Sequence, residues 1–219
     1  MTKRFERPAT IAFVGAEGEQ GLALDGLFVA GEQGAPGAGG VVAPPHPLYG
    51  GSMESPVVTE LADALFGSGA SSLRFNWRGV GASAGEARGE LEHADADYGA
   101  ALAYLAETVA GPLTACGYSF GAVAALRVGT NDPRVARLVL VAPPPALLDV
   151  AALAAFEGDV FVAVGEQDAL APAGELEAIT GTLDRACFVP IPGTDHFFLR
   201  GLAELGRSAA AWLGDASVR

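Results

Sequence analysis

The chain has 219 residues, of which 50% are hydrophobic, so it is too apolar to be disordered and long enough to bury a core without disulfides or a metal. This length predicts a single domain over residues 1–219. With 13 basic and 26 acidic side chains the formal net charge is −13, which argues against binding of nucleic acid, anionic lipid or substrates with several negative charges.

The N-terminal part of the chain is expected to form strands. Two apolar runs, residues 11–15 and 22–30, flank a glycine-rich segment, which predicts an antiparallel hairpin. Residues 41–43 predict a further short strand. The spacing of apolar residues then changes to that of a helix. Ser55 is followed by Pro56 and by apolar residues that form a stripe along one helix face. This order is typical of an N-cap followed by proline at the first helical position.

From this point strands and helices alternate along the chain. Each expected strand is apolar along its length, which is typical of a parallel sheet covered by helices on both faces. The expected strands are residues 73–77, 113–118, 135–142, 159–164 and 187–191. The expected helices are residues 57–65, 91–109, 120–128, 172–183 and 202–213. The sequence therefore predicts an α/β fold with a mostly parallel central sheet.

A possible nucleophile lies between an expected strand and an expected helix. Gly117-Tyr118-Ser119-Phe120-Gly121 fits the pattern G-x-S-x-G. The turn in such a motif is so sharp that glycines are needed where side chains would collide, and the serine hydroxyl is exposed above the sheet at a helix N-terminus. The alternative is a Gly-Ser turn that only opens a helix. The strand-turn-helix context favours Ser119 as a nucleophile.

A serine nucleophile needs a base, because its free hydroxyl is barely nucleophilic near neutral pH. In strand-turn-helix serine hydrolases the order along the chain is Ser, then Asp or Glu, then His. The one histidine that follows Ser119 is His196. Asp168 comes directly after the expected strand 159–164 and is the preferred acid, because it can hold the His196 tautomer and stabilise the imidazolium. Glu166 is the alternative acid.

Acyl transfer also needs hydrogen-bond donors for the oxyanion. The first expected donor is the N–H of Phe120, directly after the nucleophile. The second is expected from the loop of residues 46–51, whose glycines let the backbone approach a ligand. Leu48 is the preferred donor in this loop and Tyr49 is the alternative. His46 is expected to shape the loop rather than transfer a proton.

Three motifs together resemble a known family. They are His-Pro-x-x-Gly-Gly at residues 46–51, Arg-Phe-Asn-x-Arg-Gly-Val-Gly at 74–81 and Gly-x-Ser-x-Gly at 117–121. The chain resembles the α/β-hydrolases, and more closely their small lidless group of esterase-like and serine-peptidase-like enzymes, which are related to dienelactone hydrolase. The resemblance extends from about residue 40 to the C-terminus.

The resemblance implies an α/β-hydrolase fold, a triad of Ser119, Asp168 and His196, and esterase-like or peptidase-like activity. One departure concerns the first motif. The family often has His-Pro-His-Pro, where this chain has Pro-Pro-His-Pro at residues 44–47. The departure leaves the triad residues in place, but a role for the family's first histidine is not carried over.

In this fold a lid is commonly inserted after the sixth strand. Here residues 143–158, a segment of 16, separate the two expected strands, which leaves room for one turn and one helix and not for a cap domain. We therefore expect an open, shallow site that favours short acyl groups. Its expected rim is Tyr49, Trp77, Phe120 and Leu170, and Tyr49, Trp77 and Leu170 are the expected substrate contacts.

The function expected is a serine hydrolase that cleaves a small carboxylic ester or, second, an amide. Two alternatives stay open: an acyltransferase or cofactor-free peroxidase-like enzyme that uses the same triad, and a non-catalytic ligand-binding homologue.

No metal or organic cofactor is implied. The expected partner is a small-molecule ester, not nucleic acid or membrane, and the expected state is a monomer or homodimer. The chain shows neither a signal-peptide core nor a run of about 18 apolar residues, so we expect a cytoplasmic protein.

Three further residues have structural interpretations. Cys116 and Cys187 each lie in an apolar run, which predicts two buried thiols rather than a redox pair. Arg78 lies at the end of an expected strand, where it could bind a substrate carboxylate. A structural role for Arg78 is the preferred interpretation.

Overall fold

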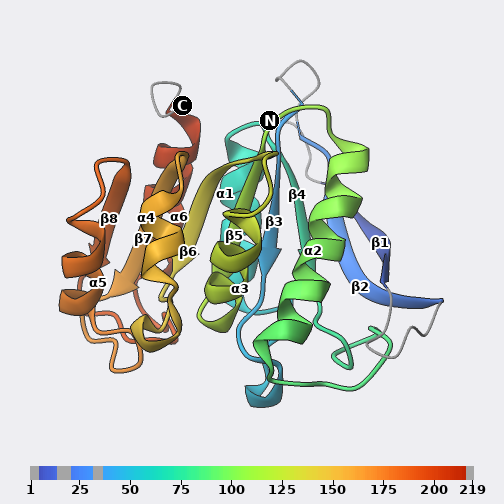
Figure 1. The fold of residues 1–219 in the computed structure, drawn as a ribbon, viewed down its shortest axis with the longest axis horizontal. Coiled ribbons are helices and arrows are strands. Elements are labelled where there is room, and N and C mark those ends of the chain that lie inside the picture. The colour runs from blue at the N-terminus through green and yellow to red at the C-terminus, as the bar shows by residue number, and fades with distance from the viewer. Residues whose placement is uncertain (1–4, 14–20, 32–36, 216–219) are drawn as a thin grey trace.

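The computed structural model describes residues 5–13, 21–31 and 37–215. Within these residues eight strands form one sheet, in the order β1-β2-β4-β3-β5-β6-β7-β8 (Figure 1). Their bounds are β1 Glu6–Phe13, β2 Leu22–Val29, β3 Gly39–Ala43, β4 Ser71–Phe75, β5 Leu113–Tyr118, β6 Val135–Val141, β7 Asp159–Gly165 and β8 Ala186–Ile191. The pairs β1–β2 and β2–β4 are antiparallel, and all the other neighbours are parallel. The predicted fold class is confirmed.

Helices cover both faces of the sheet. Their bounds are α1 Pro56–Gly67, α2 Leu91–Thr108, α3 Phe120–Gly129, α4 Val150–Ala155, α5 Ala173–Thr180 and α6 Leu202–Gly214, with short 3₁₀ turns η1 Pro47–Tyr49 and η2 Pro145–Leu147. In Figure 1, α2, α3 and α4 lie in front of the sheet, and α1 and α6 pack together behind it. None of these described helices is both long and apolar enough to cross a membrane.

The burial pattern explains which strands form the centre. Every residue of β3, β4, β5 and β7 is buried, as expected for strands covered on both faces. In the edge strand β1, by contrast, exposed residues alternate with the buried Ala9, Ile11 and Phe13. The predicted hairpin of β1 and β2 is confirmed, but β1 begins at Glu6, five residues earlier than expected. The expected glycine-rich turn lies mostly outside the described residues.

The segment between β6 and β7 contains one 3₁₀ turn, η2, and the six-residue helix α4. These two short elements use the available length, so no cap forms among the described residues, as the short connection predicted. At the start of α1 the expected cap is only partly present. Pro56 is the first helical residue, but the Ser55 hydroxyl accepts no capping hydrogen bond.

The two cysteines differ in environment. Cys116, in the central strand β5, is buried, and burial raises the pKa of its thiol. Cys187 is only partly buried, so the prediction of two buried thiols is wrong for Cys187. The reason is its position in β8, an edge strand most of whose residues are partly exposed.

Candidate active site

Ser119 occupies a strained turn between β5 and α3. Its φ is +55° and its ψ is −119°, a backbone conformation that is uncommon for a residue with a side chain. The Ser119 N–H donates to the carbonyl of Val141 at 2.8 Å, which ties the turn to β6. A Cβ at Gly117 would collide with the carbonyl of Gly121, and a Cβ at Gly121 would collide with the carbonyl of Pro44. The turn therefore requires glycine on both sides of the serine.

This crowding gives a prediction for stability. Gly121→Ala is expected to lower the free energy of unfolding by about 2 kcal/mol or more, because backbone atoms must move to admit the methyl group. Gly99→Ala is the matched control, since Gly99 also lies in a helix but its added Cβ would meet nothing within 4 Å. The control is expected to gain up to about 1 kcal/mol from its better helix propensity. Urea titrations followed by circular dichroism measure both, and equal effects would contradict the interpretation.

The three residues expected to form a triad lie in one hydrogen-bonded chain. Ser119 Oγ is 3.0 Å from His196 Nε2, and His196 Nδ1 is 2.7 Å from Asp168 Oδ2. All three side chains are buried. The other carboxylate oxygen, Asp168 Oδ1, accepts the N–H groups of Leu170 at 2.8 Å and Ala171 at 2.7 Å. With the carboxylate held in this way, Nδ1 of His196 carries the proton, and Nε2 is free to accept from the serine hydroxyl.

The other acidic residues near His196 point elsewhere. Glu166 Oε2 accepts the N–H of Gly193 at 3.2 Å, and Asp195 Oδ1 accepts the N–H of Phe197 at 3.1 Å. Glu166 thus links two loops and Asp195 forms a local turn, and the carboxylate that contacts His196 belongs to Asp168.

Tyr118 holds the loop that carries His196, and the sequence interpretation did not include it. Its hydroxyl donates to the carbonyl of His196 at 2.7 Å. The ring is buried, and burial, together with the charges of Asp168 and Asp195, raises the pKa of Tyr118, so the phenol remains a donor at neutral pH. The available signal was a hydroxyl-bearing aromatic residue beside the motif serine.

Loss of this hydrogen bond has an expected kinetic effect. Tyr118→Phe is expected to lower kcat for ester hydrolysis about 10-fold, because small displacements of a reacting group are costly. Tyr98→Phe is the control, since the Tyr98 hydroxyl also donates to buried carbonyls, at Val41 and Cys116. Both variants are expected to lose about 1 kcal/mol of stability. If kcat fell equally in both, the effect at Tyr118 would be general loosening rather than displacement of His196.

The two expected oxyanion donors differ in the structure. The N–H of Phe120 lies at the first position of α3, where a helix provides no intrahelical acceptor. The N–H of Leu48 instead donates to His46 Nδ1 at 3.2 Å, and the N–H of Tyr49 donates to the His46 carbonyl at 3.1 Å. The Leu48 amide is therefore already occupied in this structure, because the His46 side chain caps the turn η1, and Leu48 as an oxyanion donor stays a prediction.

His46 shapes the loop as expected. Besides capping η1, its ring lies 4.6 Å from the ring of Phe120 and 4.8 Å from that of Tyr49, measured between centroids. A Cβ at Gly89 would lie 2.7 Å from His46 Cε1, so the loop that follows β4 packs closely on the imidazole. Burial lowers the pKa of His46, which keeps the ring neutral and Nδ1 available as an acceptor.

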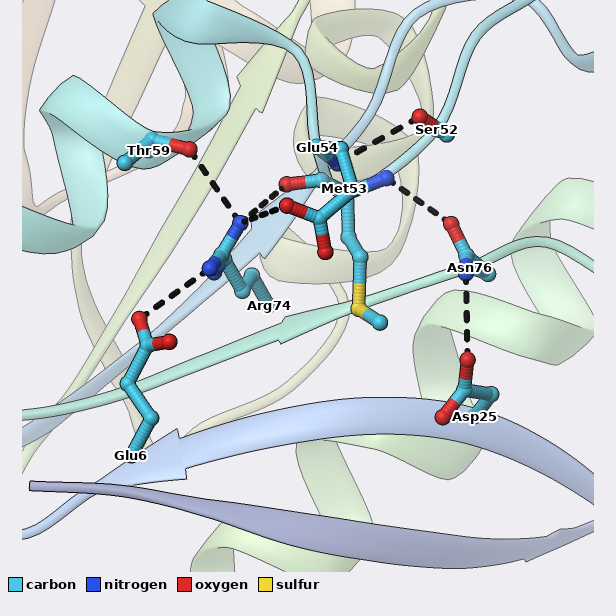
Figure 2. Close-up of polar contacts among 8 residues, drawn as sticks. All are labelled: Glu6, Asp25, Ser52, Met53, Glu54, Thr59, Arg74 and Asn76. Carbon is cyan, nitrogen blue, oxygen red and sulfur yellow. Dashed lines mark hydrogen bonds and ion pairs between the residues drawn. The ribbon is translucent and has the colours of Figure 1, made fainter. Parts of the chain in front are cut away.

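Side chains at the end of β4 hold the backbone that follows this loop. Figure 2 shows Arg74 and Asn76 on either side of Met53. Arg74 Nη1 donates to the Met53 carbonyl at 2.6 Å, and Asn76 Oδ1 accepts the Met53 N–H at 2.8 Å. Arg74 also forms an ion pair with Glu6 at 3.0 Å, and Asn76 Nδ2 donates to Asp25 at 3.3 Å. The Arg-Phe-Asn motif thus anchors the segment that leads from the loop into α1.

The next two motif residues also have structural roles. Trp77 Nε1 donates to the carbonyls of Pro44 and Pro45, at 3.2 and 3.0 Å, and the side chain is only 2% exposed. The expectation that Trp77 lines the rim is therefore wrong, because its N–H turns the indole inward. Phe120, also expected at the rim, is buried as well. Arg78 pairs with the buried Asp97, with Nη2 2.7 Å from Oδ1, so the structural interpretation of Arg78 is confirmed.

The remaining expected substrate contacts, Tyr49 and Leu170, are exposed, as is Leu48. No group of three or more His, Cys, Asp or Glu side chains within the described ranges is arranged to hold a metal ion. The side chains that the structure brings together at this site are the hydroxyl of Ser119, the imidazole of His196 and the carboxylate of Asp168.

Known proteins resemble this chain over most of its length. Residues 48–178 match the family model described as serine aminopeptidase, S33. The uncharacterized protein RP471 of Rickettsia prowazekii is 30% identical over 185 residues, which are 79% of this chain and 77% of that protein.

Two solved structures are similar to this chain in both fold and sequence. An alpha-beta serine hydrolase homologue from Coxiella burnetii has a TM-score of 0.81 at 28% identity, with 96% of this chain and 97% of that chain covered. XC6422 of Xanthomonas campestris, a serine hydrolase without a lid, has a TM-score of 0.79 at 27% identity, with 94% and 93% covered. The chain therefore belongs to the α/β-hydrolase superfamily, among its lidless serine hydrolase homologues.

Proposed function

We propose that this chain is a serine hydrolase that cleaves a small-molecule carboxylic ester. The observation that carries the proposal is the continuous hydrogen-bonded chain from Ser119 Oγ through His196 to Asp168, with the serine in a strained turn at a helix N-terminus. Membership of the serine hydrolase homologues supports it. The net charge of −13 favours neutral over anionic esters as substrates.

In the proposed reaction Ser119 Oγ attacks the ester carbonyl while His196 Nε2 takes the serine proton. Asp168 stabilises the imidazolium that forms. The tetrahedral intermediate collapses, the C–O bond to the alcohol breaks, and His196 returns the proton to the leaving oxygen. Water then attacks the acyl-enzyme with His196 as base, which releases the carboxylic acid and restores Ser119.

The proposed oxyanion donors are the N–H groups of Phe120 and Leu48. Leu48 would have to exchange His46 Nδ1 for the substrate oxygen. The Leu48 N–H gains a stronger acceptor in this exchange, because an oxyanion accepts a hydrogen bond more strongly than a neutral imidazole does. Tyr49 and Leu170, which are exposed beside the proposed site, are the proposed substrate contacts.

Labelling and turnover together test the proposal. A fluorophosphonate probe, which reacts with activated serines, is expected to label one serine per chain, and p-nitrophenyl acetate is expected to be hydrolysed. Labelling without turnover of any ester would favour acyl transfer or ligand binding. Turnover of an aminoacyl p-nitroanilide but of no ester would favour peptidase activity, which the name of the matching family model makes the second candidate. Absence of labelling would contradict the proposed nucleophile.

A further inference from the structure

The exposed apolar side chains of this chain are concentrated at the edge of the sheet that is formed by the carboxyl ends of its parallel strands. Among the described residues eight large hydrophobic side chains are exposed, and seven of them follow the carboxyl ends of β3, β6, β7 and β8. These seven are Leu48, Tyr49, Leu147, Val150, Leu170, Phe197 and Leu199. Single exposed hydrophobic residues are ordinary, but their concentration on one edge is not. Ser119 follows β5, at the centre of that same edge.

The proposed reaction divides this apolar surface into two sides. The leaving alcohol receives its proton from His196 Nε2, so it must lie on the histidine side of Ser119. The acyl group then lies on the other side, toward the loop that carries Leu48 and Tyr49, where the His46 ring packs against that of Phe120.

Two exposed apolar residues bound the histidine side. The ring of Phe197 stands perpendicular to the His196 imidazole, 5.7 Å away between centroids, and Phe197 is 66% exposed. Leu170 is 59% exposed, and its backbone N–H donates to Oδ1 of Asp168, the carboxylate that also contacts His196. Leu199 instead lines a separate hollow of about 210 Å³ and is left out of this surface.

We propose that the site takes esters of apolar alcohols, alkyl or aromatic, and that Leu170 and Phe197 bind the alcohol group. The inference rests on the proposed function. The occupant of this surface is the substrate's own alcohol group, because the surface begins where the leaving oxygen must receive its proton. A neutral apolar group also suits a chain with a net charge of −13.

The test varies the alcohol and keeps the acyl group constant. Acetates of methanol, butanol and hexanol form the same acetyl-enzyme, so differences in kcat/KM arise in ester binding and in the acylation step that expels the alcohol. Full burial of a methylene favours binding about 4-fold, and an open rim buries roughly half of it, so we expect about a 2-fold rise per methylene. From methyl to hexyl acetate the expected rise in kcat/KM is about 30-fold, measured by acid release in a pH-stat.

Serine substitutions test which residues produce the dependence of kcat/KM on the length of the alcohol. Leu170→Ser combined with Phe197→Ser is expected to reduce the hexyl-to-methyl ratio to about 3-fold or less. Phe5→Ser is the matched control, because Phe5 is 73% exposed but precedes β1, far along the sheet from β8, and it is expected to keep the full ratio. Tyr49→Ser, on the acyl side, is expected to keep the ratio as well.

The outcomes separate this inference from the proposed function. The inference would be overturned if kcat/KM of the wild type did not depend on the alcohol, or if the double variant kept the full hexyl-to-methyl ratio. In either case Ser119-dependent cleavage of methyl acetate would leave the proposed function standing. A ratio lost in Tyr49→Ser would place the alcohol on the wrong side and also overturn it. Sedimentation velocity adds a further outcome, since a dimer that dissociates in the double variant would identify a second copy as the occupant. If Ser119→Ala cleaved methyl acetate as fast as the wild type, the proposed function itself would fail.

Discussion

Ser119→Ala is expected to lose about 10⁴-fold or more of kcat for ester hydrolysis and to keep its fold. The hydroxyl contacts His196 Nε2, and its removal takes away the atom proposed to attack the carbonyl. The strained backbone at position 119 is no worse for alanine than for serine, since both carry a Cβ. Initial rates with p-nitrophenyl acetate measure the loss, and thermal unfolding checks the fold.

Ser68→Ala is the control for this variant. The Ser68 hydroxyl donates to the Leu65 carbonyl at the end of α1, so the change removes a serine hydroxyl outside the proposed site. Its rate is expected to stay within about 2-fold of the wild type, as is usual for surface substitutions. Wild-type turnover in purified Ser119→Ala would show that the nucleophile is assigned wrongly.

Asp168→Asn is expected to lower kcat by about 10⁴-fold, the magnitude known for the corresponding change in a serine protease triad. The amide can donate to His196 Nδ1, which places the imidazole proton on Nε2, where it can no longer accept the serine proton. Glu166→Gln is the matched amide substitution. Its side chain accepts the N–H of Gly193, and an amide oxygen can do the same, so a change within about 2-fold is expected. The reverse ranking at matched pH would move the acid to Glu166.

Hydrophobic period predicted the central part of the fold well. Strands β5, β6 and β7 were predicted to within one residue at each end, because β5 and β7 are fully buried and β6 is mostly apolar and buried from Leu138 onward. The start of β1 was missed, because its first residues are mostly exposed and only Ala9 among residues 6–10 is buried. Between β6 and β7 the expected turn and helix both form, as η2 and the six-residue helix α4.

The residues proposed for the triad could be chosen from the sequence because topology brings them together. Ser119 and His196 are 77 residues apart, and Asp168 and His196 are 28 apart, yet all three follow strands of a parallel sheet at one edge. Asp168 and Glu166 were harder to separate. The Glu166 N–H bonds to the Ile191 carbonyl, which continues the pairing of β7 with β8, and its side chain caps the Gly193 turn.

The sequence predictions for Trp77 and Leu48 missed hydrogen bonds that form only in the folded chain. Trp77 was expected at the rim, but its indole N–H donates to two proline carbonyls more than 30 residues earlier in the chain. For Leu48 a local signal was present. A histidine directly before Pro47 occupies a helix N-cap, where a side-chain acceptor takes the N–H two residues later.

The proposed covalent step is tested most directly by trapping the acyl-enzyme. Wild-type protein is mixed with p-nitrophenyl acetate, quenched in acid at short times and digested, and the peptides are analysed by mass spectrometry. The account predicts one acetyl group on Ser119, which appears with the burst of p-nitrophenol and is absent in Ser119→Ala. An acetyl group on another residue that decays at the turnover rate, or steady ester turnover with no acetyl on Ser119 at any time, would contradict it.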